Sequence, residues 1–107
     1  MAKAKTRPKS DEVLDVISGA LAIYQADHPR ADVKLYRQNS MSVRLRIIDP
    51  DFRGTNRAER SQAVWKYLDV LPDGAVADIS TVLLLTPDET KNSFANMEFD
   101  EPLPSKL

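Results

Sequence analysis

Apolar residues recur every three or four positions between Val13 and Tyr24, which is the spacing of an amphipathic helix. Ser10 stands just before this series and predicts the N-cap of the helix. Because the residue before Pro29 disfavours helical backbone, we expect the helix to end near Asp27. The pattern therefore predicts one long helix that buries a single face.

The period changes to two in the segments 32–37 and 41–48. Val43, Leu45 and Ile47 alternate with polar residues, so they point to one face of a strand. The link between the two segments is short and polar, which favours an antiparallel hairpin. We expect a sheet with one buried face and one polar face.

Helical periodicity returns between residues 56 and 71. Asn56 precedes it as an N-cap, and Glu59 three positions later completes a capping box. A Pro-Asp-Gly sequence then ends the helix, and residues 75–78 have the length of one more helical turn. The expected core stripe of the helix consists of Val64, Tyr67, Leu68 and Leu71.

The most apolar run of the chain covers residues 79–85. Its length and its β-branched residues favour a central strand, with Leu83 buried, over a helix. Thr86 as N-cap, Pro87 at the first helical position and Glu89 two residues later predict a short helix after this strand.

These elements follow one another as helix, strand, strand, helix, short helix, strand, short helix. The segment between the second and third strands contains a helix and is long enough for a parallel crossover. We therefore predict an α+β fold, a small two-layer sandwich of a three-stranded mixed sheet with helices on one face. A disordered basic arm is expected at 1–10, the folded domain at 11–92 and an acidic C-terminal tail at 93–107.

Composition excludes several classes of function. The chain has 107 residues, enough for one domain, and it lacks cysteine, so it has neither a thiol nucleophile nor a thiolate metal site. It has three glycines and no phosphate-binding loop or catalytic motif. We interpret His28 as a surface residue, and Asp49 and Asp51 as turn residues beside Pro50. We expect a non-enzymatic cytoplasmic protein with no metal, no cofactor and no membrane association.

Charge is distributed unevenly along the chain. Residues 1–66 hold 13 Lys and Arg against 8 Asp and Glu, whereas residues 67–107 hold 2 against 8. The outward positions of the hairpin include Lys34 and Tyr36 beside the arginines. Cations interleaved with an aromatic ring suit a nucleic-acid surface. A solvated strand face explains the same pattern. The candidate nucleic-acid-binding residues are Arg44, Arg46, Arg53, Arg57 and Arg60.

The acidic tail supports a different hypothesis. Phe94, Met97 and Phe99 are apolar residues in a polar segment, and they form a possible anchor for a protein partner. Under this alternative the chain is a protein-interaction adaptor with no role in nucleic-acid binding. Packing of the same residues on their own domain is the competing explanation.

The stretch from residue 43 to residue 64 resembles the BolA-like family. The family pattern is a strand, then F-x-G, five residues, R-H, and a valine three residues after the histidine; Phe52, Gly54, Arg60 and Val64 match it at the same spacing. The order of the predicted elements is also similar to that of the family. The resemblance implies a regulatory binding module with a fold similar to the class II K-homology fold of RNA-binding domains.

The chain departs from the family pattern at the positions that matter for its cofactor. Ser61 replaces the histidine of the R-H pair, and Asp78 stands near the place of a second histidine. The loop from Arg37 to Met41 contains neither Cys nor His, although this loop and the second histidine supply ligands for a [2Fe–2S] cluster shared with a monothiol glutaredoxin in the family. Only the first glycine of a G-x-x-G backbone clamp is present, at Gly54. We therefore expect no iron–sulfur cluster in this protein.

Overall fold

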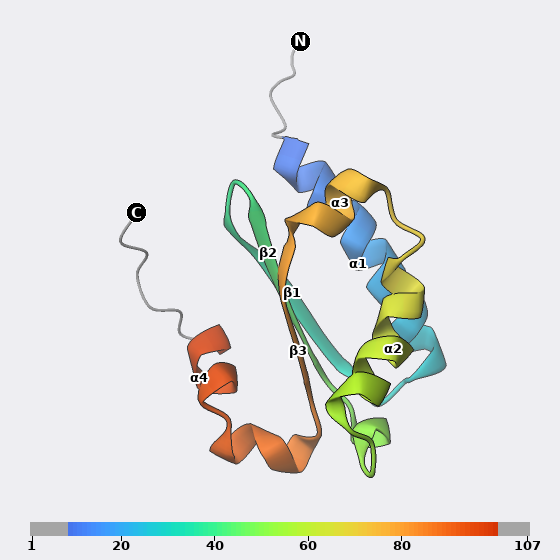
Figure 1. Cartoon of the computed structure of the whole chain (residues 1–107), viewed down its shortest axis with the longest axis vertical. Coiled ribbons are helices and arrows are strands. Elements are labelled where there is room, and N and C mark those ends of the chain that lie inside the picture. Colours follow the sequence, from blue (N-terminus) through green and yellow to red (C-terminus); the bar gives the residue numbers. More distant parts are fainter. Residues whose placement is uncertain (1–8, 101–107) are drawn as a thin grey trace.

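The structure is a computed structural model that describes residues 9–100. Figure 1 shows its elements and their order along the chain. They are α1 (Lys9–Asp27), β1 (Asp32–Asn39), β2 (Ser42–Ile48), the 3₁₀ helix η2 (Pro50–Phe52), α2 (Arg57–Leu68), α3 (Asp73–Asp78), β3 (Ile79–Leu85), the 3₁₀ helix η3 (Pro87–Asn92) and α4 (Phe94–Asp100).

One mixed sheet with the strand order β1-β2-β3 organises the fold. β1 and β2 pair antiparallel as a hairpin, and β2 and β3 pair parallel. The predicted α+β sandwich with a three-stranded mixed sheet is therefore confirmed. The expectation that 79–85 is a central strand is wrong, because β3 pairs on one side only and forms an edge of the sheet.

The core lies between the inner face of the sheet and the helices α1 and α2. Val43, Leu45 and Ile47 are fully buried there, as their alternation predicts. They meet Ile17, Leu21 and Tyr24 of α1 and Val64 and Leu68 of α2, which are buried in the same cluster. Leu83 is only half-buried, contrary to expectation, because it pairs with Arg46 in the register of the sheet and so lies on the outer face.

Local capping signals place most helix ends correctly. Asn56 and Glu59 form the expected capping box at the start of α2, and Thr86 forms a second one with Glu89. The prediction of Ser10 as N-cap is wrong, because α1 already begins at Lys9. α1 therefore starts within the segment predicted as a basic arm, and the rest of that segment, 1–8, lies outside the described part of the chain.

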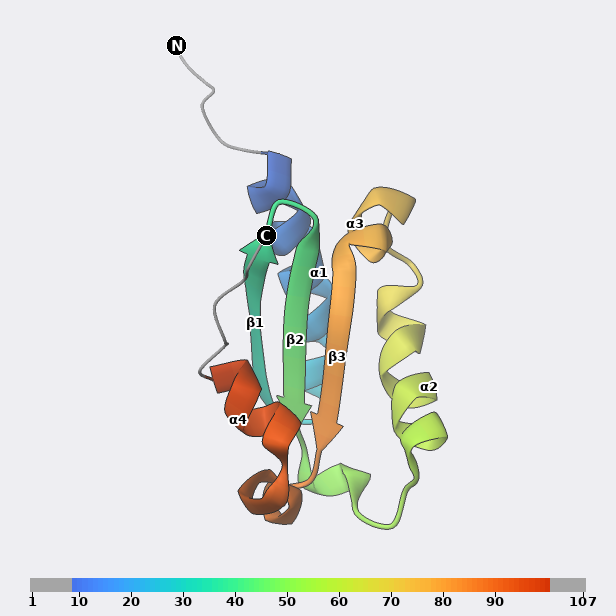
Figure 2. The same ribbon diagram turned by 60° about the vertical axis from the view of Figure 1, so that its left-hand side comes forward.

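The C-terminal segment, for which the sequence leaves a partner anchor and packing on the domain as alternatives, packs on the domain through residue 100. Residues 94–100 form α4, which crosses the outer face of the sheet, on the side opposite α1 (Figure 2). Phe99 is buried beneath it with 1% of its surface exposed. The rest of the predicted tail, 101–107, lies outside the described residues. Every helix within 9–100 is too short or too polar to span a lipid bilayer.

Candidate functional site

Four side chains project together from the outer face of the hairpin. Tyr36 is the register partner of Arg44, and Lys34 is the register partner of Arg46. Partners in register lie side by side on the same face of a sheet, so the four form one compact group. The alternation in the sequence thus correctly predicts that these cations and this ring share one face of the sheet.

Helix α4 covers this group. Arg44 donates hydrogen bonds from both terminal nitrogens to the carboxylate of Glu98. Arg46 donates to Asp100 Oδ1 at 2.8 Å and to Asn96 Oδ1 at 2.9 Å. The expectation that Arg44 and Arg46 are exposed is wrong: each retains only 7% of its surface, because Phe99 of α4 inserts between the helix and the sheet.

Phe99 makes aromatic and cationic contacts with the same group. Its ring centroid lies 5.0 Å from that of Tyr36 and 4.9 Å from the guanidinium carbon of Arg46. The hydroxyl of Tyr36 donates a hydrogen bond to the backbone carbonyl of Phe99 at 3.1 Å. The sequence 98–100 therefore presents a carboxylate, a ring and a second carboxylate to the two arginines.

The charged groups of this interface shift one another's pKa values. The hydrogen bonds to Glu98 raise the pKa of Arg44, against the opposing effect of burial. The hydrogen bond from Arg46, with a smaller contribution from Lys34, lowers the pKa of Asp100. The Nε atoms of Arg44 and Arg46 are buried and have no hydrogen-bond partner within the described part of the chain. The cluster is thus paired but not fully satisfied.

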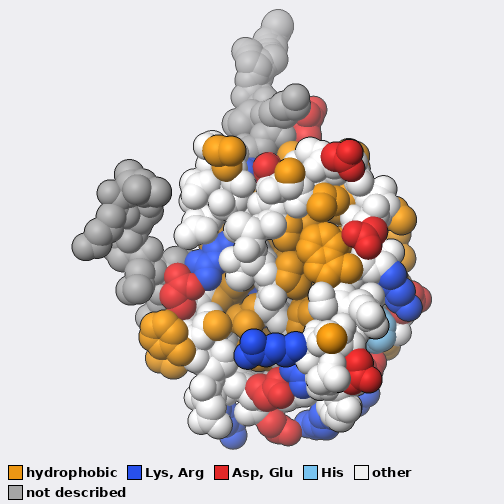
Figure 3. Space-filling view, viewed as in Figure 1, with side chains coloured by type: hydrophobic (Ala, Val, Ile, Leu, Met, Phe, Trp, Pro, Cys, Tyr) orange, Lys and Arg blue, Asp and Glu red, His pale blue; other side chains and the backbone are white. Residues whose placement is uncertain are grey.

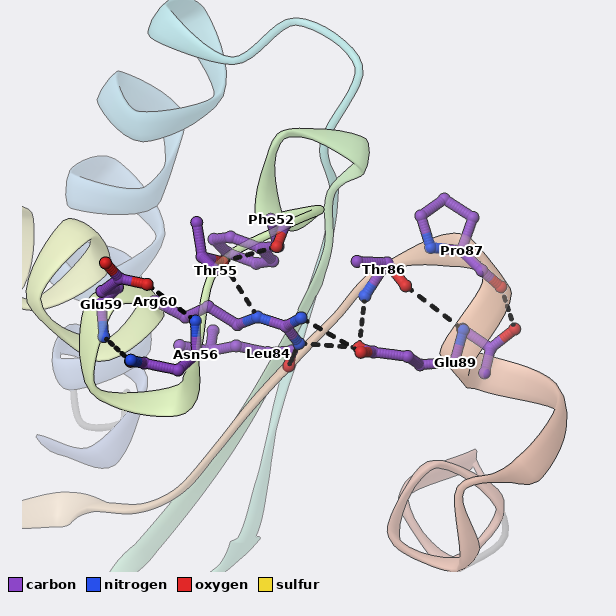
Figure 4. Close-up of polar contacts among 10 residues, drawn as sticks. Phe52, Thr55, Asn56, Glu59, Arg60, Leu84, Thr86, Pro87 and Glu89 are labelled. Carbon is purple, nitrogen blue, oxygen red and sulfur yellow. Dashed lines mark hydrogen bonds and ion pairs between the residues drawn. The ribbon is translucent and has the colours of Figure 1, made fainter.

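Arg60 is also withdrawn from solvent, contrary to the predicted open patch. It donates to Glu89 at 2.7 and 3.0 Å and to the backbone carbonyl of Leu84 at 3.1 Å (Figure 4). Its guanidinium carbon lies 5.6 Å from the ring centroid of Phe52, which is buried. Arg60 therefore joins the start of α2 to the end of β3 and to η3, with the ring of Phe52 beside it. Val64, the last residue of the family pattern, is fully buried in the core.

The other two predicted arginines remain exposed. Arg53 keeps 58% of its side chain in solvent and makes one long contact, 3.3 Å, with Asp88. Arg57 is exposed at the first position of α2, and its side chain makes no hydrogen bond or ion pair within residues 9–100. The five predicted arginines thus do not form one surface, because the segment from η3 to α4 separates Arg44 and Arg46 from Arg57.

A groove of about 620 Å³ runs between α2 and this C-terminal segment. β3 forms its floor, and Figure 3 shows apolar side chains exposed on this face between the two walls. The turn at its lower end contains Gly54, which has a φ of +79°, in the left-handed region that favours glycine. The lining residues are Thr55, Asn56, Arg57, Arg60 and Ser61, Val82 to Leu85, and Glu89, Ser93 and Ala95.

A further polar cluster was not predicted as a group. His28 Nδ1 lies 2.9 Å from Asp51 Oδ2 and 3.5 Å from the fully buried Asp49, and such donors could hold a metal ion. However, Asp49 already accepts a 2.6 Å hydrogen bond from the hydroxyl of Tyr24, and Asp51 accepts one from Arg30. The cluster therefore serves to fasten the end of α1 to η2. No local signal reveals it, since its members come from segments 21 to 25 positions apart.

The positions that depart from the family pattern have other roles. The carboxylate of Asp78 accepts a hydrogen bond from Arg37 at 3.1 Å, and Ser61 lines the groove. Neither offers the soft sulfur or imidazole donor that iron–sulfur clusters require.

In comparisons with known proteins, no family model, no curated protein and no solved structure matches this chain.

Proposed function

We propose that this chain is a divergent BolA-like domain that acts as a non-enzymatic binding module for single-stranded nucleic acid. Its binding surface is the outer face of the β1–β2 hairpin, with Lys34, Tyr36, Arg44 and Arg46. In the described conformation α4 occupies this surface. The single observation that carries the proposal is the placement of Glu98, Phe99 and Asp100 on the two arginines.

The three residues of α4 resemble the ligand in chemistry. A nucleic-acid strand offers alternating anions and flat rings, and Glu98-Phe99-Asp100 offers a carboxylate, a ring and a carboxylate in the same order. Arginine pairs with phosphate through the same planar donors that it uses for carboxylate. A surface that accommodates this segment therefore has the donors and the stacking partner for a nucleotide.

The presence of arginines, and not of apolar residues, beneath α4 also favours the binding of an anionic ligand at this surface when α4 is absent. Burying an ion pair costs desolvation, and an apolar pair of similar volume often stabilises a protein as well or better. Arg44 and Arg46 are buried, and their Nε atoms have no hydrogen-bond partner among residues 9–100, so each guanidinium keeps one donor that α4 does not use. A phosphate backbone supplies more acceptors than one carboxylate per arginine.

Helix α4 is weakly enough held to leave the surface. It has seven residues, and a helix of this length is unstable in isolation. Burial of one phenylalanine contributes about 1.5–3 kcal/mol, and partly exposed ion pairs add about 0–1 kcal/mol each. An open state of about 0.1–10% is then expected, which makes nucleic-acid binding weak in the unmodified chain.

The experiment compares a variant in which the ion pairs that hold α4 are removed, the loosened chain, with a control variant of the same net charge in which they remain. Glu98→Gln with Asp100→Asn is expected to bind a fluorescent 12-nucleotide single strand roughly tenfold more tightly than the unmodified chain, because less competition remains. The control, Asp69→Asn with Asp73→Asn, removes the same charge from the α2–α3 connection. Adding Arg44→Gln and Arg46→Gln to the loosened chain should abolish the gain and reduce the salt slope by about 1 per contacting arginine.

All variants carry Gln at Lys3, Lys5, Arg7 and Lys9, so that the basic N-terminal residues cannot produce the signal. Equal binding by the loosened chain and its control would refute the proposal.

The adaptor alternative is supported by a separate observation. Phe94 and Met97 keep 73% and 60% of their surface exposed on the outer side of α4. Phe99, the third residue of the predicted anchor, is buried on its own domain and is not accessible to a partner while α4 is docked.

A further inference from the structure

The open edge of β3 shows a different interaction surface. β3 pairs with β2 on one side, and no strand among residues 9–100 pairs with its other side. The amide of Asp49, which follows β2, donates to the carbonyl of Leu85 at 2.9 Å, so the groups of Leu85 face β2. Backbone groups alternate sides along a strand. Val82 and Leu84 therefore direct their amides and carbonyls away from the sheet.

The edge is capped at only one point. Arg60 occupies the outward carbonyl of Leu84 at 3.1 Å. Within residues 9–100 no hydrogen bond reaches the outward groups of Val82 or the amide of Leu84. Two donors and one acceptor are thus available along the floor of the groove.

The side chains of β3 are exposed in a way that those of β2 are not. Five of the seven residues of β2 are buried, whereas every residue of β3 is half-buried or exposed. An apolar strand with an open edge tends to pair with another chain, and natural proteins usually block such an edge with charges, bulges or a covering segment. Here the edge instead lies in the groove lined by residues of α2 and of the η3–α4 segment. Figure 1 shows β3 running between these two parts of the chain.

We infer that the groove binds an extended peptide segment of a partner protein, which adds as a fourth strand to β3 and places an acidic residue beside Arg57. Strand addition gives affinity through main-chain hydrogen bonds, and the walls of the groove give specificity. This surface is distinct from the outer face covered by α4, and binding there does not require α4 to move.

Charge selects the kind of partner. Among the charged residues that line the groove, Arg60 and Glu89 neutralise each other, which leaves Arg57 as the available charge. The first amides of α2 add positive potential at the same end. A second copy that paired edge to edge through its own β3 would offer the sequence of Ile79–Leu85, which contains no acidic residue. An acidic extended segment of another protein fits better than a second β3 edge.

The test uses two capped six-residue peptides of alternating threonine and valine, one with glutamate at its first position and one with glutamate at its last. Only one of the two peptides should bind well, because Arg57 lies at a single end of the edge. Which peptide binds shows whether the added strand runs parallel or antiparallel to β3. On binding, hydrogen exchange of the Val82 and Leu84 amides should slow, whereas the Leu83 amide, which already faces β2, should not change. This alternation is expected only for an added strand.

Charge variants on α2 provide the matched comparison. Arg57→Glu should weaken binding of the acidic peptide roughly tenfold, and Lys66→Glu, the same reversal on the same helix outside the groove, should leave it within about twofold. A peptide with glutamine in place of glutamate should bind equally to the unmodified chain and to Arg57→Glu.

Three results would overturn the inference. The first is failure of both peptides to bind at millimolar concentration. The second is slow exchange of Val82 in the absence of peptide together with a dimer in sedimentation, which would make a second copy the occupant. The third is that an oligonucleotide, but neither peptide, slows hydrogen exchange of the Val82 and Leu84 amides.

Discussion

Arg60 and Glu89 form a two-pronged ion pair, with nitrogen–oxygen distances of 2.7 and 3.0 Å, across 29 positions of sequence. The same carboxylate accepts the backbone amide of Thr86 and so completes the capping box of η3 (Figure 4). Glu89 therefore both caps the start of η3 and holds η3 to α2.

This pair predicts an acid-dependent loss of stability. The hydrogen bonds from Arg60 and the amide of Thr86 lower the pKa of Glu89 from 4.5 to about 2. A lowered pKa contributes stability above pH 4.5, and this contribution is lost as the pH falls from 4.5 through 2. Because 44% of the Glu89 side chain is exposed, we expect a contribution of about 1 kcal/mol after screening.

Urea unfolding at pH 7, 4.5 and 3 measures this effect. Glu89→Gln should unfold more easily at pH 7 and lose less stability on acidification than the unmodified chain. Glu59→Gln alters the equivalent capping position of α2, which has no arginine partner, and should keep the original pH dependence. Identical pH profiles for Glu89→Gln and the unmodified chain would contradict the prediction.

Phe99 should account for most of the docking of α4. Phe99→Ala is expected to reduce the free energy of unfolding by about 1.5–3 kcal/mol, because this side chain is buried between helix and sheet. Phe94→Ala removes the same atoms from the exposed side of α4 and should change stability by less than about 0.5 kcal/mol. Denaturant unfolding distinguishes the two, and equal effects would show that α4 is not anchored by Phe99.

Gly54 should resist substitution for a backbone reason alone. Its φ is +79°, and a Cβ built there meets no atom within 4 Å, so Gly54→Ala strains the backbone without a clash. We expect a destabilisation of about 1 kcal/mol. Gly19→Ala also has open space but lies in the helical backbone of α1, and it should stabilise the protein by about 0.5–1 kcal/mol. A neutral Gly54→Ala in thermal or urea unfolding would show that this turn relaxes.

The buried hydrogen bond from Tyr24 to Asp49 should be worth more than its exposed counterpart. Tyr24→Phe leaves a fully buried carboxylate without its shortest donor, and we expect a cost of about 1.5–3 kcal/mol. Tyr67→Phe removes a bond of the same length to Asp27 at the surface and should cost less than about 0.5 kcal/mol. Both are measured by urea unfolding at pH 7, and equal costs would show that burial of Asp49 does not strengthen its bond.

The sequence by itself determined the order of the main helices and strands from α1 to η3, the inner face of the hairpin and the caps of α2 and η3. Each of these depends on residues within a few positions of one another: the alternation around Leu45, the pair Asn56 and Glu59, and the pair Thr86 and Glu89. Such signals act through local backbone geometry, so they can be interpreted without knowledge of the fold.

Only the tertiary structure decided which of the predicted arginines meet solvent. Arg44 and Glu98 lie 54 positions apart, and no local pattern indicates that a polar C-terminal segment returns as a helix to cover the hairpin. The position of β3 at the edge, and hence the groove beside it, likewise depends on how strands distant in sequence pair. Alternation specifies that a side chain leaves the core, but the elements that pack on the other face determine whether it reaches water.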